Sequence, residues 1–481
     1  MSYTPPGGTE TDDGTGVYFS RTNTSGLDVS TVNATGSSTD AVITPSTIES
    51  ALSSANVSLT ASRDIKVQQP ITLSSSSNTL TLNSGDSIVV DQAITGGNAL
   101  NLHSDGGVAV NAELSANTID IRANSSGGLS GSGNISTTSS LEALQAGNTT
   151  YSGQISGTGI LRKNGTGKLS LTGVKSFTGD TTVNAGTLES VGTAMSSAVA
   201  VAAGATYEID LVSASDTAIY SKIISGEGSF VKSGAGDLTF DQVHTYTGST
   251  SISGGTLKTS GSGSLGSSTA LSVASGATYE VGADEEVGSI AGSGSISLGA
   301  NQLTAGGSGT DTTFGGVISG TGGLTKTGSG TLTLSGANTY TGASNVSGGL
   351  LSVSGSLSDG TAVSVSEGAT YEVGADEEVG SIAGSGSISL GANQLTAGGS
   401  GTDTTFGGVI SGTGGLTKTG SGTLKLSGAN IYTGATNISG GRLTTTSSGS
   451  LSSATAISVA SGATYEVGAD EEVGSIAGSG S

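Results

Sequence analysis

The residues of this sequence best suited to chemistry form an acidic triplet that occurs three times. Its copies are Asp284-Glu285-Glu286, Asp376-Glu377-Glu378 and Asp470-Glu471-Glu472. Three carboxylates could hold a calcium ion, or supply an acid and a base to a glycan-cleaving enzyme. Adjacent carboxylates more often form a solvated face, and an active site in three copies would be unusual. We therefore predict no catalytic residue, no cofactor and no bound metal, with the carboxylates of the first two triplets as the only candidates for calcium.

A second pattern resembles the Gly-Asp-Ser…Asp-x-x-His arrangement of some esterases. The Gly-Asp-Ser motif ends at Ser87, and the Asp-x-x-His motif ends at His244. Members of a catalytic triad must touch, but these two residues belong to distant repeated segments. His244 also occupies the position held by Asn338 and Asn430 in other copies of its repeat. We interpret the match as a coincidence.

A third pattern resembles the calcium-binding nonapeptide of β-roll proteins. Gly-Gly-Ser-Gly-Thr-Asp occupies residues 306–311 and recurs at 398–403. In a β-roll the ion lies between adjacent turns, so the motif must occur in tandem, whereas these copies are 92 residues apart (398 − 306). We predict structural corners here.

Four lysines recur at equivalent positions, one or two residues after an apolar residue. They are Lys163, Lys232, Lys326 and Lys418. We predict that they project outward, where pairing with a neighbouring carboxylate would contribute at most about 1 kcal/mol. His103 also follows an apolar position, and we predict a surface residue there.

Composition excludes several classes of function. The 481 residues include 84 Gly but no Cys, and the formal net charge is −22. This charge would repel a phosphate backbone, so we predict no nucleic-acid partner. The absence of Cys excludes disulfides and thiolate metal sites. The lack of an apolar stretch of 18 residues predicts no membrane insertion by this segment.

The elements that position these residues are repeated. Residues 276–332 and 368–424 are identical, and residues 318–342 and 410–434 differ at two positions only. Thr333 is replaced by Lys425 between two leucines, which predicts an outward position. Thr339 is replaced by Ile431, which predicts a corner. Repeats of this kind indicate a stacked architecture.

Shorter spacings identify the structural unit as a coil. Four apolar columns recur near the N-terminus. They are Leu59, Leu82, Leu102 and Ile121; Ile65, Ile88 and Val108; Val67, Val90 and Val110; and Ile71, Ile94 and Leu114. Alternating apolar runs are typical of strands, and the Gly, Asn, Asp and Ser between them suit corners. We predict an all-β fold, a right-handed parallel β-helix of about 20–23 residues per coil, with three short strands in each coil.

At this point the sequence resembles a known family. The pattern GxGGLxKxGxGxLxLxGxNxYTGxTxVxxGxL is similar to the passenger-associated β-strand repeat of bacterial autotransporter adhesins. The coils at about 50–145 resemble those of filamentous-haemagglutinin-type exoproteins. The resemblance implies a right-handed β-helix, export across the outer membrane, and a role as a stalk or adhesive surface.

We accordingly predict three regions. Residues 1–45 form an N-terminal polar segment or cap, residues 46–150 form haemagglutinin-like coils, and residues 151–481 form passenger-type repeats. The repeat units have 92–94 residues, and the last is truncated. Because the sequence stops in mid-unit at Ser481, we expect further repeats beyond it.

The predicted function is that of a secreted, rod-like, non-catalytic repeat protein at the bacterial cell surface. It would serve as an adhesin or surface-display stalk, and its partner would be an extracellular surface, a glycan or a cell-surface ligand. One alternative is a subunit of an extracellular filament or surface sheath, which self-associates end to end through open β-helix ends. The other is a polysaccharide-acting β-helix enzyme.

Overall fold

The computed structural model describes residues 17–19, 31–34, 41–124 and 127–481. They form an all-β parallel solenoid with roughly 20 residues per coil, which confirms the predicted fold class. The described part of the chain includes one helix, α1 (Pro45–Leu52), and none of its helices has the length and hydrophobicity needed to cross a bilayer. Most of the predicted N-terminal segment over 1–45 lies outside the described residues.

The chain packs as two units. The first comprises the described residues up to Val212 together with Tyr220–Ser233, and the second comprises Ser213–Ile219 and Gly234–Ser481. The division at residue 150 that the sequence motifs suggested stays a prediction.

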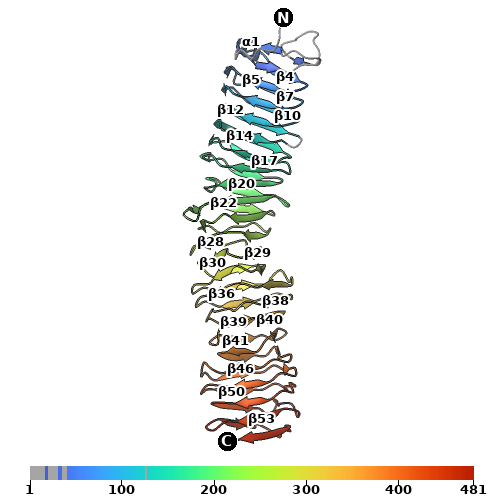
Figure 1. Cartoon of the computed structure of the whole chain (residues 1–481), viewed down its shortest axis with the longest axis vertical. Helices are drawn as coiled ribbons and strands as arrows, with labels where there is room; N and C mark the ends of the chain where they lie inside the picture. Colours follow the sequence, from blue (N-terminus) through green and yellow to red (C-terminus); the bar gives the residue numbers. More distant parts are fainter. Residues whose placement is uncertain (1–16, 20–30, 35–40, 125–126) are drawn as a thin grey trace. The chain divides into compact units, whose positions relative to one another are not determined.

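Parallel strands of the first unit stack coil upon coil (Figure 1). One sheet contains β2 (Thr31–Ala34), β4 (Val57–Ala61), β7 (Thr79–Ser84), β10 (Ala99–Ser104), β12 (Leu114–Ala123), β14 (Ile135–Gln145), β17 (Ile160–Asn164), β19 (Thr181–Val183), β21 (Val199–Val201) and β24 (Ile224–Gly226). Also joined to this sheet are β6 (Ile71–Leu73), β9 (Ile94–Gly96) and β16 (Ile155–Gly157). A second sheet contains β13 (Leu129–Ser130), β11 (Val108–Val110), β8 (Ile88–Val90), β5 (Ile65–Val67), β1 (Val17–Phe19) and β3 (Ala41–Ile43), with β1 antiparallel to both of its neighbours. A third contains β15 (Thr149–Tyr151), β18 (Lys168–Leu171), β20 (Thr187–Val191), β22 (Thr206–Asp210) and β25 (Ser229–Ser233).

The core of this unit consists of the predicted apolar columns. Leu59 pairs with Leu82, Leu82 with Leu102, and Leu102 with Ile121. The three other predicted columns are in register as well. All of these side chains are buried, because alternate residues of each strand point inward and stack on the same position of the next coil.

The second unit contains four stacks of parallel strands. The first is β26 (Asp237–Phe240), β28 (Thr256–Thr259), β30 (Thr278–Glu280), β33 (Ser295–Ser297) and β36 (Val317–Ser319). The second is β27 (Thr250–Ile252), β29 (Ala270–Val273), β32 (Ser289–Gly292), β35 (Thr312–Phe314), β38 (Thr331–Leu334), β40 (Leu350–Val353), β42 (Thr370–Val373), β45 (Ser387–Ser389) and β48 (Ile410–Ser411). The third is β31 (Glu285–Val287), β34 (Leu303–Ala305), β37 (Leu324–Lys326), β39 (Ser344–Val346), β41 (Ala362–Val365), β44 (Ser381–Gly384), β47 (Thr404–Phe406), β50 (Thr423–Leu426), β52 (Arg442–Thr445) and β54 (Thr464–Glu466). The fourth is β43 (Glu377–Val379), β46 (Leu395–Ala397), β49 (Leu416–Lys418), β51 (Thr436–Ile438), β53 (Ala456–Val459) and β55 (Ser475–Gly478).

The sequence repeat of this unit is not a whole number of coils. Glu285 and Glu377 are 92 residues apart (377 − 285), whereas ladder partners such as Leu303, Leu324 and Ser344 follow one another at intervals of about 20 residues. The identical strands β31 and β43 therefore lie in different sheets, as do β32 and β44. Each repeat begins on a different side of the coil from the one before it.

The predicted outward positions are confirmed. Leu332 and Leu334 are buried on either side of Thr333, which is partly exposed, and Lys425 is exposed. Ile431 lies outside any strand with 62% of its surface exposed, as a corner predicts.

Candidate functional site

The repeated buried asparagines and glutamates lie where one sheet of the second unit ends and another begins on the same side of the coil. At one such place β36 is the last strand of its sheet, and β43 is the first strand of the next. Between them two coils carry only an isolated bridge, from Ala337 to Ser356. We call such a place a ladder break. Equivalent breaks precede β31 and follow β48.

A buried asparagine bridges the first half of the break. Oδ1 of Asn338 accepts a hydrogen bond from the Ile318 amide at 3.0 Å, and Nδ2 donates to the carbonyl oxygens of Gly336 at 3.0 Å and Ser356 at 3.1 Å. Asn430 makes the same three bonds in the next repeat. The side chain thus replaces ladder hydrogen bonds that the backbone does not make.

A buried glutamate bridges the second half. Oε1 of Glu377 accepts from the amide of Leu357, 20 residues earlier, at 2.9 Å. Glu285 accepts in the same way from Leu265 at 3.1 Å, and its Oε2 accepts from the Tyr279 hydroxyl at 3.0 Å. Burial raises the pKa of both carboxyls to about 7. In the third copy Glu471 contacts Leu451 and Tyr465 but is only half-buried.

The acidic triplets are therefore split between the inside and the outside of the coil. Glu285 and Glu377 are only 5% exposed, whereas the residues on either side of each point outward. Asp284 and Asp376 accept hydrogen bonds from the amides of the next coil, at 2.8 Å each. The expectation of a solvated face was wrong for the middle residue of the triplet. The three carboxylates do not converge, and the described ranges contain no group of three or more acidic or histidine side chains arranged as metal ligands.

The repeated lysines are also buried, so the prediction that they project outward was wrong. Lys163, Lys232, Lys326 and Lys418 have at most 1% of their surface exposed. Nζ of Lys326 donates to the carbonyl oxygens of Thr327 at 2.6 Å, Gly328 at 3.2 Å and Gly348 at 3.1 Å. The apolar stem stacks in an inward column between Ala305 and Val346, and the ammonium group holds two successive corners together. Burial lowers the pKa of Lys326 and Lys418, and that of Lys163 to about 8.

The two residues of the esterase-like pattern are engaged separately. Oγ of Ser87 donates to Oδ1 of Asp64 in the first unit at 2.5 Å. His244, in the second unit, is 2% exposed, with its ring centroid 4.0 Å from that of Phe240. Burial lowers the pKa of His244 to about 4, which keeps its imidazole neutral at pH 7.

The nonapeptide-like segments form corners whose aspartates hydrogen-bond to the next coil. Oδ1 of Asp311 accepts a hydrogen bond from the amide of Thr331 at 2.7 Å. Asp403 bonds Thr423 at the same distance in the next repeat.

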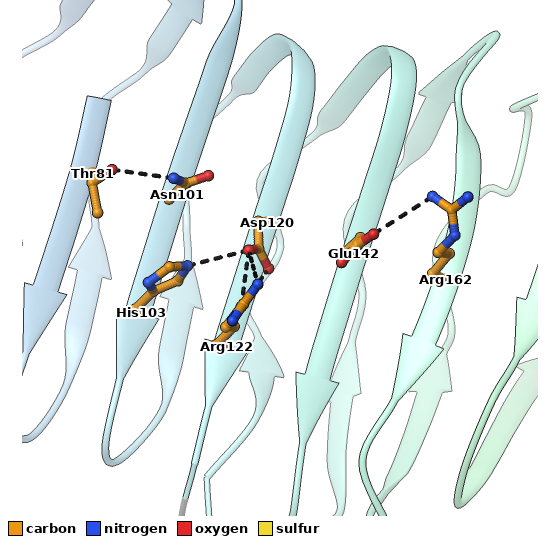
Figure 2. Close-up of polar contacts among 7 residues, drawn as sticks. All are labelled: Thr81, Asn101, His103, Asp120, Arg122, Glu142 and Arg162. Atoms are coloured by element: carbon orange, nitrogen blue, oxygen red, sulfur yellow. Dashed lines mark hydrogen bonds and ion pairs between the residues drawn. The ribbon is translucent and has the colours of Figure 1, made fainter. Parts of the chain in front are cut away.

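The outer surface of the first unit carries a polar ladder that sequence reasoning did not identify (Figure 2). We call it the ladder face. Its members are Thr81, Asn101, His103, Asp120, Arg122, Glu142 and Arg162. In one column, Thr81, Asn101, Asp120, Glu142 and Arg162 are in register on consecutive coils.

Neighbouring coils of the ladder face are joined by their side chains. Nδ2 of Asn101 donates to Thr81 at 3.1 Å, and Arg162 lies 3.5 Å from Glu142. His103, for which the sequence named no partner, lies 3.3 Å from Asp120, which also binds Arg122 at 2.8 Å. Burial raises the pKa of Asp120, but the hydrogen bonds from His103 and Arg122 outweigh it, and the net pKa is lowered. The side chains of Arg122 and Arg162 are 48% and 38% exposed.

One signal in the sequence could have located the buried glutamates. Glu285-Glu286-Val287 precedes Leu303-Thr304-Ala305 by 18 residues (303 − 285), close to one coil, and the two segments pair in register. Glu285 therefore stands in a column otherwise held by Leu303 and Leu324. The column rule that found the first unit's core also places this carboxylate inside.

Comparison with known families agrees with this architecture. The passenger-associated-transport-repeat matches residues 161–189, 230–258, 324–353 and 416–444. This confirms the resemblance to the repeats of autotransporter passenger domains. No curated protein and no solved structure shows significant similarity to the chain.

Proposed function

We propose that this chain, which carries four repeats of autotransporter passenger domains, is a non-catalytic segment of a secreted adhesin or surface-display stalk on the bacterial surface. One observation carries the proposal. The repeated Lys, Asn and Glu side chains that could perform chemistry point inward and bind backbone groups of neighbouring coils. The exposed side chains of the strands and corners remain available to a partner.

The ladder face is the surface we assign to adhesion. Its side chains stand on consecutive coils at a spacing of about 4.8 Å, which suits an extended ligand with many weak contacts. Arginine forks and amide groups bind carboxylates and hydroxyl groups, so the partner would be a glycan or another ligand of a cell surface. The net charge of −22 argues against nucleic acid.

An adhesion assay tests the proposal. Beads coated with the whole chain are applied to cell monolayers and to surfaces coated with a panel of polysaccharides. We expect saturable attachment that Arg122→Gln with Arg162→Gln reduces. Lys425→Thr is the matched control, because it removes an exposed cation where the other repeat has Thr333.

Two results would contradict the proposal. Release of sugars from the polysaccharide panel would favour an enzyme. Fibres of the purified chain at neutral pH, without bead attachment, would favour a filament or sheath subunit.

A further inference from the structure

We propose that Glu285 and Glu377 are pH-dependent links in the second unit. Each holds a ladder break closed while its carboxyl is protonated, and loss of the proton weakens that closure. The inference does not depend on the adhesive function. It concerns the ladder breaks, where strand pairing is reduced to an isolated bridge between two coils.

The position of the carboxyl at the break supports the proposal. β31 and β43 are the first strands of their sheets, so no strand pairs with them on the side of the preceding coil. There the glutamate Oε1 is bonded to the amide of Leu265 or Leu357. These side chain–backbone bonds hold the new strand to the coil before it, and opening of the break would expose the carboxyl to water.

The surroundings of the carboxyls supply few groups that favour a charge. Glu285 faces Tyr279 and Tyr246, and Glu377 faces Tyr371, Tyr340 and the like-charged Asp359. Burial raises the pKa of all four tyrosines, so they stay neutral. An ionised carboxylate inside the coil therefore keeps hydrogen bonds but has no countercharge from these groups.

Glu377, in the second copy, has fewer hydrogen bonds than Glu285. Thr259 forms a hydrogen bond with Glu285, and Val353 stands at the equivalent position beside Glu377. Oε2 of Glu377 and the hydroxyl of Tyr371 have no hydrogen-bond partner among the described residues. Oε2 of Glu377 therefore lacks the hydroxyl donor that Oε2 of Glu285 receives from Tyr279.

The direction of the pH effect follows from linkage. The pKa of each carboxyl is about 7 in the folded unit and 4.5 in its ordinary state. Between these two pH values, folding takes up to one proton per glutamate from solvent, and no covalent bond changes except the O–H bond of the carboxyl. The stabilisation is complete below pH 4.5 and is lost as the pH rises through 7. The equilibrium for opening a break should rise up to about tenfold per pH unit in this window.

Hydrogen exchange of the whole chain, read by mass spectrometry, measures the opening directly. Peptides that contain the Leu265 and Leu357 amides are followed from pH 5 to pH 8, and protection is corrected for the intrinsic exchange rate. We expect protection to fall by on the order of 100-fold across this range. In Glu285→Gln with Glu377→Gln the fall should disappear, because the amide keeps an acceptor oxygen but cannot titrate.

The control removes the same number of carboxyl groups one residue away. Glu286→Gln with Glu378→Gln alters exposed neighbours, so protection should fall with pH as in the unaltered chain. Protection that is independent of pH in the unaltered chain, or that falls equally in the buried-glutamate variant, would overturn the proposal.

A second measurement does not need a variant that folds. At pH 6 the exposed carboxylates are ionised, so the infrared carbonyl band of protonated carboxyl groups reports the buried ones. We expect this band in the unaltered folded chain, with loss at a midpoint near pH 7. Complete ionisation of all carboxyls by pH 6 would contradict the proposal.

Discussion

Glu285 and Glu377 occupy the same position of an identical sequence, yet they begin different sheets of the second unit. The repeat length of 92 residues and the coil of roughly 20 residues account for this, because each repeat ends part of the way around a coil. A surface feature of one repeat is therefore presented on another side by the next.

Deletion of residues 324–415 tests this arrangement. The deletion joins two equivalent positions of the repeat and removes 92 residues (415 − 324 + 1). At a strand spacing of about 4.8 Å, the second unit should shorten by about 20 Å. Small-angle scattering measures the length, and the variant should still unfold cooperatively. Failure to fold cooperatively would indicate that the unit is not built from exchangeable coils.

Lys326→Met tests the buried ammonium group. Methionine keeps the apolar stem but leaves the carbonyl oxygens of Thr327, Gly328 and Gly348 without their donor. We expect the free energy of unfolding to fall by about 1–3 kcal/mol. Chemical denaturation followed by circular dichroism measures the loss. Lys425→Thr is the control and should change stability by less than about 0.5 kcal/mol, because Lys425 is exposed.

The inward and outward faces of β38 should respond in opposite ways to charge. Leu332→Asp places a carboxylate at a position that is 1% exposed and should cost more than about 4 kcal/mol. Thr333→Lys should be silent, since Lys425 already occupies the equivalent position. Thermal unfolding of both variants measures the difference, and equal melting temperatures would refute the assignment of faces.

His244→Asn should make the free energy of unfolding less sensitive to acid. The pKa of His244 is about 4, below the ordinary 6.5, because the ring is buried. The stabilisation of the folded chain by the neutral imidazole is complete above pH 6.5. It is lost as the pH falls through 4, which lowers the free energy of unfolding by up to about 3 kcal/mol. Asparagine, as in Asn338 and Asn430, does not titrate. The difference in unfolding free energy between the two chains should therefore change over this range, and a constant difference would count against a buried neutral imidazole.

The sequence predicted the fold well because its apolar columns repeat at the coil length. Leu59, Leu82 and Leu102 are in register as their spacing indicated. It predicted the polar interior poorly, because residue type favours an exposed position for Lys326 and Glu285, whereas their columns place both inside. Inside a solenoid an ammonium or carboxyl group can be satisfied by the backbone of the next coil, which residue type alone does not reveal.

The ladder face follows from the predicted register of Leu102 and Ile121, but no local motif marks its polar residues as partners. Asp120, His103 and Arg122 form a cluster only because β10 and β12 pair with Asn101 opposite Asp120. The register of two neighbouring coils, and not any local motif, creates this surface.

The central claim is that inward polar residues build the solenoid and that the ladder face serves attachment. The most direct test measures attachment of coated beads per folded molecule for Lys326→Met and for Arg122→Gln with Arg162→Gln. The account predicts that the interior variant loses stability but keeps attachment. It predicts the reverse for the arginine variant, with attachment reduced and the free energy of unfolding lowered by at most about 1 kcal/mol. Loss of attachment by fully folded Lys326→Met, with none in the arginine variant, would contradict it.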